Sequence, residues 1–266
     1  MLTTLSDYRL VAGNLDASLR NVSEQPEVKR EAEHYLARIG EIKTIEEFLA
    51  DERIYRFAIK ASGLEDMIYA KAFMRKVLEE GIESPDSFAN KLADTRFRDF
   101  ARRFNFHSYG ASATTFERAR QAVVDDYIRL TLEEQSGQSN EGVRLALYFQ
   151  RKAPSLKTGY DVLADRALMK VAETILGYSL VHGDIDKHAK AVEKALDLAN
   201  LQKPGALDKL IARFTVMWDM NNPGGATAGF GGAGGQAASA LLVQPLAAGV
   251  GQDLLMTLQT LKITGR

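Results

Sequence analysis

The segment HGDIDKH, residues 182–188, carries the residue types best suited to metal binding. Histidine nitrogens and carboxylate oxygens are common ligands of divalent metals. The candidate ligands are His182, Asp184, Asp186 and His188. Their alternate spacing would gather them on one face of a strand, but the flanking residues have helical periodicity. The segment also lacks the Gly and Glu that an EF-hand loop needs at its sixth and twelfth positions. We expect the two aspartates to open a helix, with a loose surface metal site as the alternative.

A second motif, G-x-G-x-x-G, is formed by Gly229, Gly231 and Gly234 within NNPGGATAGFGGAGG, residues 221–235. A dinucleotide-binding loop of this type follows a strand and opens a helix, so that the pyrophosphate meets the helix N-terminus. Here the preceding segment, KLIARFTVMWDM, has a helical pattern. Seven of the fifteen residues are glycine, so composition alone explains the motif. We expect a flexible linker and no nucleotide or other cofactor.

Arginine and aromatic residues are interleaved in RFRDFARRFNFHSYG, residues 96–110. Such a mixture can track and stack single-stranded nucleic acid. The aromatic residues Phe97, Phe100 and Phe104 fall at helical spacing, which predicts a core helix with the arginines on its solvated face. The net charge of −1 gives no general attraction for nucleic acid. We expect no nucleic-acid partner; an anion-binding or partner-binding patch and a nucleic-acid-binding regulator are the alternatives.

Motifs for nucleophilic catalysis are absent from the sequence. There is no G-x-S-x-G elbow and no P-loop. The chain has no cysteine, which excludes disulfides, thiolate chemistry and cysteine-based zinc sites. Adjacent carboxylates do not converge on one helix face, so we interpret three such pairs as solvated surface. These pairs are Glu79-Glu80, Asp125-Asp126 and Glu133-Glu134. The sequence therefore predicts a protein that is not an enzyme.

The composition is that of an ordinary water-soluble protein, with 266 residues, 45% hydrophobic and 26% charged. The first residues do not combine a basic segment with an apolar one, so no signal peptide is predicted. An uncharged run extends from Met220 to Gln252, but its apolar part is about a dozen residues long and contains Pro245. A spanning helix needs roughly 20 residues. We expect no membrane span, and either a cytoplasmic location or export without a cleaved signal.

The strongest pattern is a repeat that begins with Leu-Ala-Asp, at Leu49, Leu92 and Leu163. Counted from each leucine, positions +5, +8, +9 and +12 are apolar in every copy, which describes one face of a helix. The aspartate of each copy stands where it can cap the helix N-terminus. The caps are Asp51, Asp94 and Asp165, and the predicted buried residues are Ile54, Phe57, Ala58 and Ala61; Phe97, Phe100, Ala101 and Phe104; and Leu168, Val171, Ala172 and Ile175. A weaker copy begins near Asp208, with Ile211, Phe214 and Trp218.

The spacing of these copies indicates an internal duplication. Asp51 and Asp94 are 43 residues apart, as are Asp165 and Asp208, and the two pairs are offset by 114. At this offset residues 27–44 align without a gap on residues 141–158. We predict an all-α, internally duplicated helical bundle over residues 1–220, with similar halves at about 1–112 and 113–220.

The remaining helix signals are local. Residues 66–81 have helical spacing and end at Gly81, residues 84–92 open with Ser-Pro, and Gly63 and Gly177 stand where repeat helices should stop. After residue 220 we predict a Gly-rich linker over 221–235 and a C-terminal tail over 236–266. The tail contains an amphipathic helix whose apolar stripe is a candidate partner-binding surface. The stripe consists of Leu254, Leu255, Leu258 and Leu261.

Several blocks in order along residues 5–220 resemble one family. They are DYRLVAGNL, EVKREAEHYLARIGEIKTIEEFLADERIYRFAIKASGLEDMIYAKAFMRKVLEEG, NEGVRLALYFQRKA, YDVLADRALMKVAETILG and LDKLIARFTVMWDM, followed later by DLLMTLQTLK. The chain resembles a family of uncharacterised alphaproteobacterial proteins that carry a domain of unknown function and are encoded among flagellar genes. The resemblance implies a motility-associated bacterial protein, and it brings no catalytic residues.

Two functions from different classes follow. The first is a non-enzymatic protein–protein interaction protein of flagellar assembly, structure or regulation, which binds flagellar components or itself by docking its C-terminal helix in a groove. It would act in the cytoplasm, or at the flagellum after export without a cleaved signal peptide. The second is a small-molecule- or metal-dependent helical enzyme with a site between the two halves, near His107 or residues 182–188.

Overall fold

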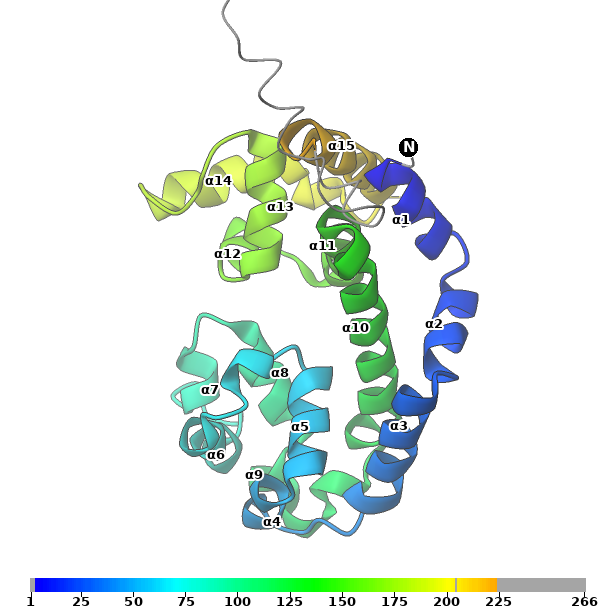
Figure 1. Cartoon of the computed structure of the whole chain (residues 1–266). Helices are drawn as coiled ribbons and strands as arrows, with labels where there is room; N and C mark the ends of the chain where they lie inside the picture. The colour runs from blue at the N-terminus through cyan, green and yellow to red at the C-terminus, as the bar shows by residue number, and fades with distance from the viewer. Residues whose placement is uncertain (1–2, 204, 224–266) are drawn as a thin grey trace, which may run out of the picture. The chain divides into compact units, whose positions relative to one another are not determined.

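The chain divides into two units, residues 1–226 and 227–266, and the computed structural model describes residues 3–203 and 205–223, all in the first unit (Figure 1). Every regular element among these residues is a helix and none is a strand, so the predicted all-α class is confirmed. The α-helices are α1 (Thr4–Ala12), α2 (Leu15–Ser23), α3 (Pro26–Ile39), α4 (Ile45–Ala50), α5 (Glu52–Ala61), α6 (Lys71–Glu80), α7 (Phe88–Lys91), α8 (Thr95–Arg103), α9 (Phe106–Tyr109), α10 (Gln121–Ser139), α11 (Glu141–Lys152), α12 (Gly159–Leu163), α13 (Arg166–Leu176), α14 (Ile185–Leu196) and α15 (Ala206–Asn221). Short 3-10 turns are η1 (Glu65–Met67), η2 (Gly110–Thr115), η3 (Glu117–Ala119), η4 (Ala153–Ser155) and η5 (Leu198–Asn200).

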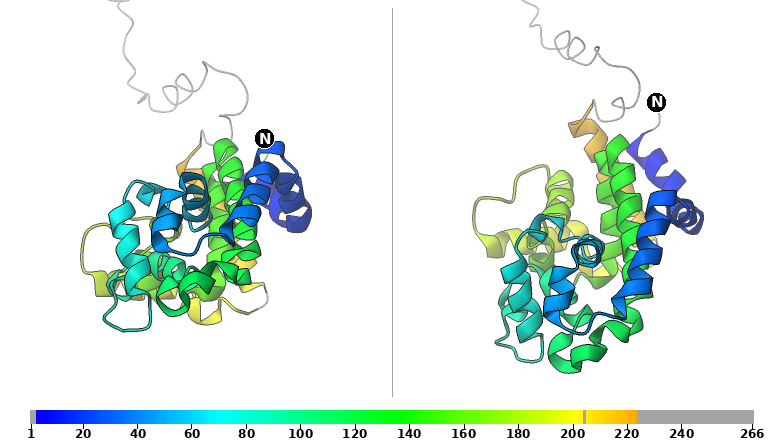
Figure 2. Two further views of the ribbon diagram at one scale, coloured as in Figure 1. Left: turned by 90° about the horizontal axis from the view of Figure 1, so that it is seen from below. Right: turned by 60° about the horizontal axis from the view of Figure 1, so that its bottom comes forward.

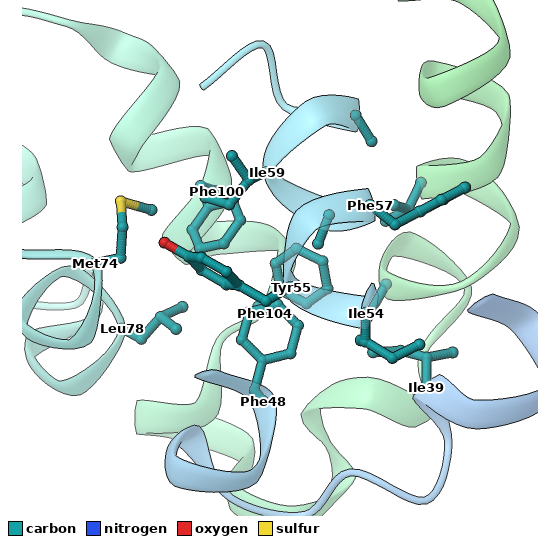
Figure 3. Close-up of a cluster of buried hydrophobic side chains, with 14 of the residues drawn as sticks. Ile39, Phe48, Ile54, Tyr55, Phe57, Ile59, Met74, Leu78, Phe100 and Phe104 are labelled. Atoms are coloured by element: carbon teal, nitrogen blue, oxygen red, sulfur yellow. The ribbon is translucent and has the colours of Figure 1, made fainter. Parts of the chain in front are cut away.

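Helices α3 to α10 enclose the first of two large hydrophobic cores, which is rich in aromatic rings. The ring centroid of Phe48 lies 4.9 Å from that of Phe104, and Tyr35 stacks on Phe57 at 4.5 Å. Figure 3 shows Phe48, Phe100 and Phe104 gathered between the surrounding helices. Truncating a fully buried phenylalanine to alanine costs about 3–5 kcal/mol, so this aromatic cluster is a principal source of stability for these helices.

The second core is formed by α1 together with α11 to α15. Phe149 from α11 and Phe214 from α15 are almost completely buried in it, and Tyr8 reaches it from α1. The approach of α15 to α11 is so close that a Cβ atom on Gly142 would lie 2.4 Å from the ring of Trp218. Glycine is therefore required at this crossing, because a larger residue would force the two helices apart.

The repeat predicted the faces that each core buries. All twelve apolar positions of the three copies are buried, with exposed fractions of 8% or less. The carboxylates of Asp51, Asp94 and Asp165 accept hydrogen bonds from backbone N–H groups in the first turns of α5, α8 and α13. Both predictions are confirmed. Caps of this kind satisfy donors that the helix itself leaves unpaired, and each stabilises by about 1 kcal/mol.

Two further helix starts share a more elaborate cap. The hydroxyl oxygens of Thr44 before α4 and Thr158 before α12 each accept a hydrogen bond from the backbone N–H three residues later. The acidic side chain of that later residue in turn accepts a hydrogen bond from the threonine N–H. This reciprocal arrangement is a capping box. Helices α5 and α13 end beside Gly63 and Gly177, whose φ angles are +66° and +78°. Glycine adopts such angles without steric cost, and the predicted stops are confirmed.

Helix α10 is the longest element, with 19 residues, and it packs against α2, α3, α5 and α11 (Figures 1 and 2). It supplies Val123 and Val124 to the first core. Helix α1 instead packs against α11 and α15. The Thr4 backbone N–H and hydroxyl both donate to Asp219, and Asn140 donates to the Thr4 oxygen at 2.8 Å. These buried hydrogen bonds fix the start of α1 to the second core.

Two local predictions were wrong at their boundaries. The helix predicted over 66–81 begins only at Lys71, because residues 65–67 form a 3-10 turn. The segment at 84–92 forms just one helical turn from Phe88, because Pro85 lies in the preceding loop. The weaker copy was located correctly, because Asp208 lies in the first turn of α15 and Ile211, Phe214 and Trp218 are buried. Local signals therefore located these helices correctly, and neighbouring turns set their ends.

Several predictions lie outside the described residues. These are the Gly-rich motif at 229–234, most of the predicted linker over 221–235, the tail over 236–266 and the leucine stripe at 254–261. None of the helices in the described part of the chain combines the length and apolar character needed to cross a membrane.

Candidate functional site

A polar cleft lies between the two cores. It consists of three adjoining cavities of about 580, 350 and 90 Å³. Helices α5, α8 and α10 line one side, and α11, α12 and α13 line the other. Lys152, the last residue of α11, lines all three cavities. We call the three cavities together the polar cleft.

Glu133 on α10 anchors the wall of the largest cavity. Its side chain is only 3% exposed, and it accepts two hydrogen bonds from Arg151, at 2.8 and 2.9 Å. Arg129, one helical turn earlier on α10, donates a third at 3.2 Å. The interpretation of Glu133 as solvated surface was wrong. After Asn140 the chain turns, and α11 packs on α10 so that Arg151 reaches the carboxylate.

Arg151 is held firmly in its charged state. Burial alone lowers the pKa of its guanidinium, but the hydrogen bonds and negative charge of Glu133 outweigh burial, and the pKa is raised. The guanidinium also lies over the ring of Tyr148, 5.0 Å from its centroid. A buried cation that combines bidentate pairing with ring stacking is well stabilised. The Glu133–Arg151 pair therefore fixes the angle between α10 and α11.

Asp165 links the cleft to the start of α13. One carboxylate oxygen accepts hydrogen bonds from the backbone N–H groups of Ala167 and Leu168, and the other accepts a hydrogen bond from the hydroxyl group of Tyr148. Burial, followed by the charge of Asp165, raises the pKa of Tyr148 above its ordinary value, so the phenol stays protonated. Both oxygens of Asp165 are thus occupied within the protein.

Arg96 on α8 is also paired. Its guanidinium donates to the Oδ2 atom of Asp94 at 2.7 Å, to the Oδ1 atom at 3.1 Å, and to the carbonyl oxygen of Gly63. Across the large cavity, Lys60 pairs with Glu134 at 2.7 Å and with Glu65 at 3.6 Å. Most charges at this end of the cleft therefore neutralise one another.

Lys152 differs from these paired residues. It forms no ion pair with any carboxylate in the described part of the chain. Burial, followed by the positive charge of Arg151, lowers the pKa of its ammonium group, and Asp99 and Asp165 only partly oppose this effect. A desolvated lysine that faces a cavity is a candidate functional residue.

Two arginines on α8 add hydrogen-bond donors that lack acceptors. The Nε atom of Arg98 and the Nη1 atom of Arg103 are both buried and have no hydrogen-bond partner among the described residues. Arg98 lines the 350 Å³ cavity and Arg103 lines the 90 Å³ cavity, each beside Lys152. Buried N–H groups nearly always find an acceptor in native proteins. Arg98 and Lys152 thus give the wall of the 350 Å³ cavity two basic side chains without a carboxylate partner among the described residues.

Residues 61–207 match a family described as a protein of unknown function, DUF1217. This stretch is more than half of the chain. The chain belongs to the DUF1217 family. Every residue that lines the polar cleft lies inside the matched stretch.

A crystal structure from a structural genomics programme supports the same assignment. It is a protein of Agrobacterium tumefaciens, with 49% sequence identity over 83% of this DUF1217 chain and 94% of the other, and a TM-score of 0.78. None of the curated proteins matches the sequence. The resemblance to a domain of unknown function is thus confirmed, and the relative comes from an alphaproteobacterium.

The metal candidates of this DUF1217 chain have other partners. Asp184 caps α14 by accepting hydrogen bonds from the N–H groups of Asp186 and Lys187, which confirms the predicted helix start. Asp186 accepts the hydroxyl of Tyr160 at 2.6 Å. Across residues 3–203 and 205–223, no three His, Asp or Glu side chains are arranged to hold a metal ion. Neither His182 nor His188 lines the polar cleft.

Other predicted site residues of the DUF1217 chain also lie outside the cleft. The Nδ1 atom of His107 is 2.8 Å from the carbonyl oxygen of Glu79, and the ring packs on Gly81. Phe97, Phe100 and Phe104 are buried, which confirms the predicted core helix. The prediction that all four arginines of α8 are solvated was wrong for three. Arg96, Arg98 and Arg103 are partly buried, and Arg96 and Arg103 line the 90 Å³ cavity together with the end of α11.

The sequence signal for the cleft was weak but present. Arg129 and Glu133 are four residues apart on α10, a spacing typical of an exposed ion pair on a helix. Nothing local showed that Arg151 would cover this pair, or that Lys152 would face α8. The other adjacent carboxylates are exposed or partly buried, and Asp126 pairs with Arg103.

Proposed function

We propose that this protein is a non-enzymatic interaction protein of the bacterial flagellum, which takes part in its assembly, structure or regulation. Support for the flagellar setting comes from the resemblance of residues 5–220 to proteins encoded among flagellar genes. Support for an interaction role comes from apolar side chains on the surface. The partner is a flagellar component or a second copy of the chain.

The observation that carries the interaction role lies between α13 and α14. Val181 and Ile185 are 62% and 60% exposed, and Tyr178 nearby is 48% exposed. Three large apolar side chains within eight positions are exposed to water here, so they do not gain the favourable free energy of burial. Exposed apolar groups that lie close together are typical of protein-binding surfaces. We name residues 178–185 the apolar loop.

A double substitution in the apolar loop tests this role. Val181→Ser with Ile185→Ser should leave the fold intact, because both positions are exposed. It should reduce swimming motility and the recovery of partner proteins from motile cells. The matched control is Leu10→Ser on α1, a position that is 74% exposed. If the double variant swims and recovers partners as the wild type does, the apolar loop is not the interaction surface.

The tail offers a second mode of docking. Its predicted stripe of Leu254, Leu255, Leu258 and Leu261 suits a helix that binds in a groove of another chain. Deletion of residues 236–266 should lower partner recovery and motility. Unchanged motility and recovery after this deletion would exclude the docking helix. The result also separates the tail from the apolar loop, which the deletion leaves in place.

We also infer that residues 1–220 arose by internal duplication, with halves at about 1–112 and 113–220. Support comes from three helix pairs that begin 114 residues apart, the same offset as in the sequence repeat. The pairs are α4 and α12, which begin at Ile45 and Gly159; α5 and α13, at Glu52 and Arg166; and α6 and α14, at Lys71 and Ile185. The two capping boxes, at Thr44 and Thr158, have the same offset.

The duplicated halves exchange their first helices. At the same offset, α10 corresponds to α1 and α2 together. Helix α10 supplies Val123 to the first core, whereas α1 supplies Tyr8 to the second. Each half therefore completes the other, and we expect residues 1–112 alone to show no cooperative unfolding by circular dichroism. A cooperative transition in this fragment would contradict the exchange.

A cytoplasmic location, or export to the flagellum without a cleaved signal peptide, fits the proposed function. The two locations are separated by fractionating motile cells with and without a functional flagellar export apparatus. An exported protein should appear outside the cell only when the apparatus works, and a cytoplasmic assembly factor should be retained in both.

The second candidate function is a small-molecule-dependent helical enzyme with its site between the halves. The polar cleft favours it, because a continuous apolar contact between the cores would leave no room for a substrate. The candidate would place substrate beside Lys152 and Arg98. It requires first that the cleft bind a ligand.

A further inference from the structure

Charge in the polar cleft is unevenly paired. Four basic and three acidic side chains line the 350 Å³ cavity. Asp99 pairs with Arg102 at 2.7 Å, and Asp161 accepts the backbone N–H groups of Lys157 and Thr158. The third acid, Asp165, is occupied by the α13 cap and Tyr148, as described above. All three carboxylates therefore have partners within the protein.

The basic side chains of this cavity are not equally satisfied. Arg98, Lys152 and Lys157 form no ion pair with any carboxylate of the described residues. Arg98 also has a buried Nε–H without an acceptor, whereas Arg103, which lines the adjoining 90 Å³ cavity, already pairs with Asp126. The 350 Å³ cavity therefore holds three cationic side chains, Arg98, Lys152 and Lys157, that no carboxylate of the described residues neutralises.

An anion would resolve this imbalance. It would accept hydrogen bonds from the guanidinium group of Arg98 and neutralise the ammonium groups of Lys152 and Lys157. A ligand that pairs with these cations offsets the cost of holding unpaired charges in a partly buried cavity. Charge-assisted bonds to arginine and lysine are among the strongest hydrogen bonds in proteins.

We propose that the polar cleft binds a small molecule that carries a phosphate group, at Lys152, Arg98 and Lys157. Three cations suit the two charges and several oxygens of a phosphate better than the single charge of a carboxylate. The 350 Å³ cavity is within the range of small-molecule sites. The carboxylates of Asp99 and Asp161 at the wall of this cavity repel extended polyanions. They can also accept hydrogen bonds from the hydroxyl groups of a compact ligand.

The site differs from the proposed interaction surface in residues and in partner. None of the residues of the apolar loop lines the cleft. Binding to the cleft is measured on the isolated chain, so its outcome is independent of motility and partner recovery. Failure of one proposal therefore leaves the other intact.

Isothermal titration of the full chain tests the proposal, with inorganic phosphate and ribose 5-phosphate as probes at constant ionic strength. Sodium chloride added to the same ionic strength serves as the reference for non-specific screening. We expect saturable binding of at least one phosphate probe by the wild type. Tighter binding of ribose 5-phosphate identifies a phosphate monoester as the ligand class, and tighter binding of inorganic phosphate identifies the free anion.

Two substitutions locate the binding. Lys152→Met and Arg98→Met should each weaken phosphate binding by at least about tenfold, the equivalent of one charge-assisted hydrogen bond. Lys187→Met is the matched control, because this side chain is 82% exposed and lies outside the cleft. Circular dichroism and thermal unfolding verify that each variant is folded. Absence of binding by the wild type to both probes at millimolar concentration overturns the proposal, as does unchanged binding in Lys152→Met.

Discussion

Arg151 and Lys152 are consecutive residues at the end of α11, yet they meet opposite electrostatic environments. Arg151 donates two hydrogen bonds to the buried carboxylate of Glu133, and its pKa is raised. Lys152 has no carboxylate partner among the described residues, and burial lowers its pKa. Successive helix residues point about 100° apart, so one side chain turns to α10 and the next to the cavities beside α8.

The comparison distinguishes charged side chains that stabilise the fold by pairing with one another from a charged side chain that has no carboxylate partner. A buried ion pair is costly to desolvate, but removing one member is costlier still, because the other charge is then left alone. A half-buried cation without a carboxylate partner, such as Lys152, bears part of that cost in the native state. Natural proteins retain such groups mainly where function uses them. The contrast between Arg151 and Lys152 thus identifies Lys152 as the functional candidate.

The largest expected effect comes from removing the partner of Arg151. Glu133→Gln keeps the shape of the side chain but leaves the charges of Arg129 and Arg151 uncompensated. We expect the free energy of unfolding to fall by about 3–5 kcal/mol, as measured by urea denaturation. The neighbouring Glu134→Gln is the control, because its side chain is 33% exposed and it should cost no more than about 1 kcal/mol. Equal losses of unfolding free energy in the two variants would show that Glu133 contributes no more to stability than its neighbour Glu134.

Removing the unpaired cation should have the opposite sign. Lys152→Met keeps the length of the apolar stem and deletes the desolvated charge beside Arg151. We expect the free energy of unfolding to rise by about 0.5–2 kcal/mol, with a higher melting temperature. Destabilisation would mean that Lys152 contributes to the fold as Arg151 does, and the contrast between the two residues would be lost.

The helix faces could be read from the sequence because they depend on local periodicity. The positions of Phe57, Phe100 and Val171 and the caps at Asp51 and Asp165 follow from spacing within one segment. The site could not be read in this way, because its residues belong to helices that meet only in the fold. Glu133 is buried by α11, and the amphipathic pattern of α10 alone makes it a surface residue. The repeat also says nothing of Lys152, whose environment is set by α8 from across the cleft.

A pH dependence sharpens the comparison further. Burial is the main cause of the lowered pKa of Lys152. The positive charges of Arg151 and Arg96 lower this pKa further, and the negative charges of Asp99 and Asp165 oppose them. A cation whose pKa is lower in the folded state than in the unfolded state reduces the free energy of unfolding wherever it is protonated in both states. This cost disappears as the pH rises from the folded-state pKa through 10.5, the ordinary pKa of lysine. The stability advantage of Lys152→Met over the wild type should therefore be largest near pH 7 and shrink toward pH 10.5. Urea denaturation of both proteins across this range measures the difference, and a constant advantage would contradict the assigned cause.

The smallest expected effect comes from Asp165, which stands between the paired and the unpaired charges. Asp165→Asn preserves the α13 cap, because asparagine caps helices about as well as aspartate, but it removes a negative charge that faces Lys152. We expect stability to fall by no more than about 1 kcal/mol. Phosphate should bind about two- to fivefold more tightly, since one partly screened charge contributes about 0.5–1 kcal/mol at this range. Thermal unfolding and phosphate titration measure the two quantities on one sample. Weaker phosphate binding would show that Asp165 positions the cations through Tyr148 rather than merely offsetting their charge, and the cleft would then depend on the paired network for its function.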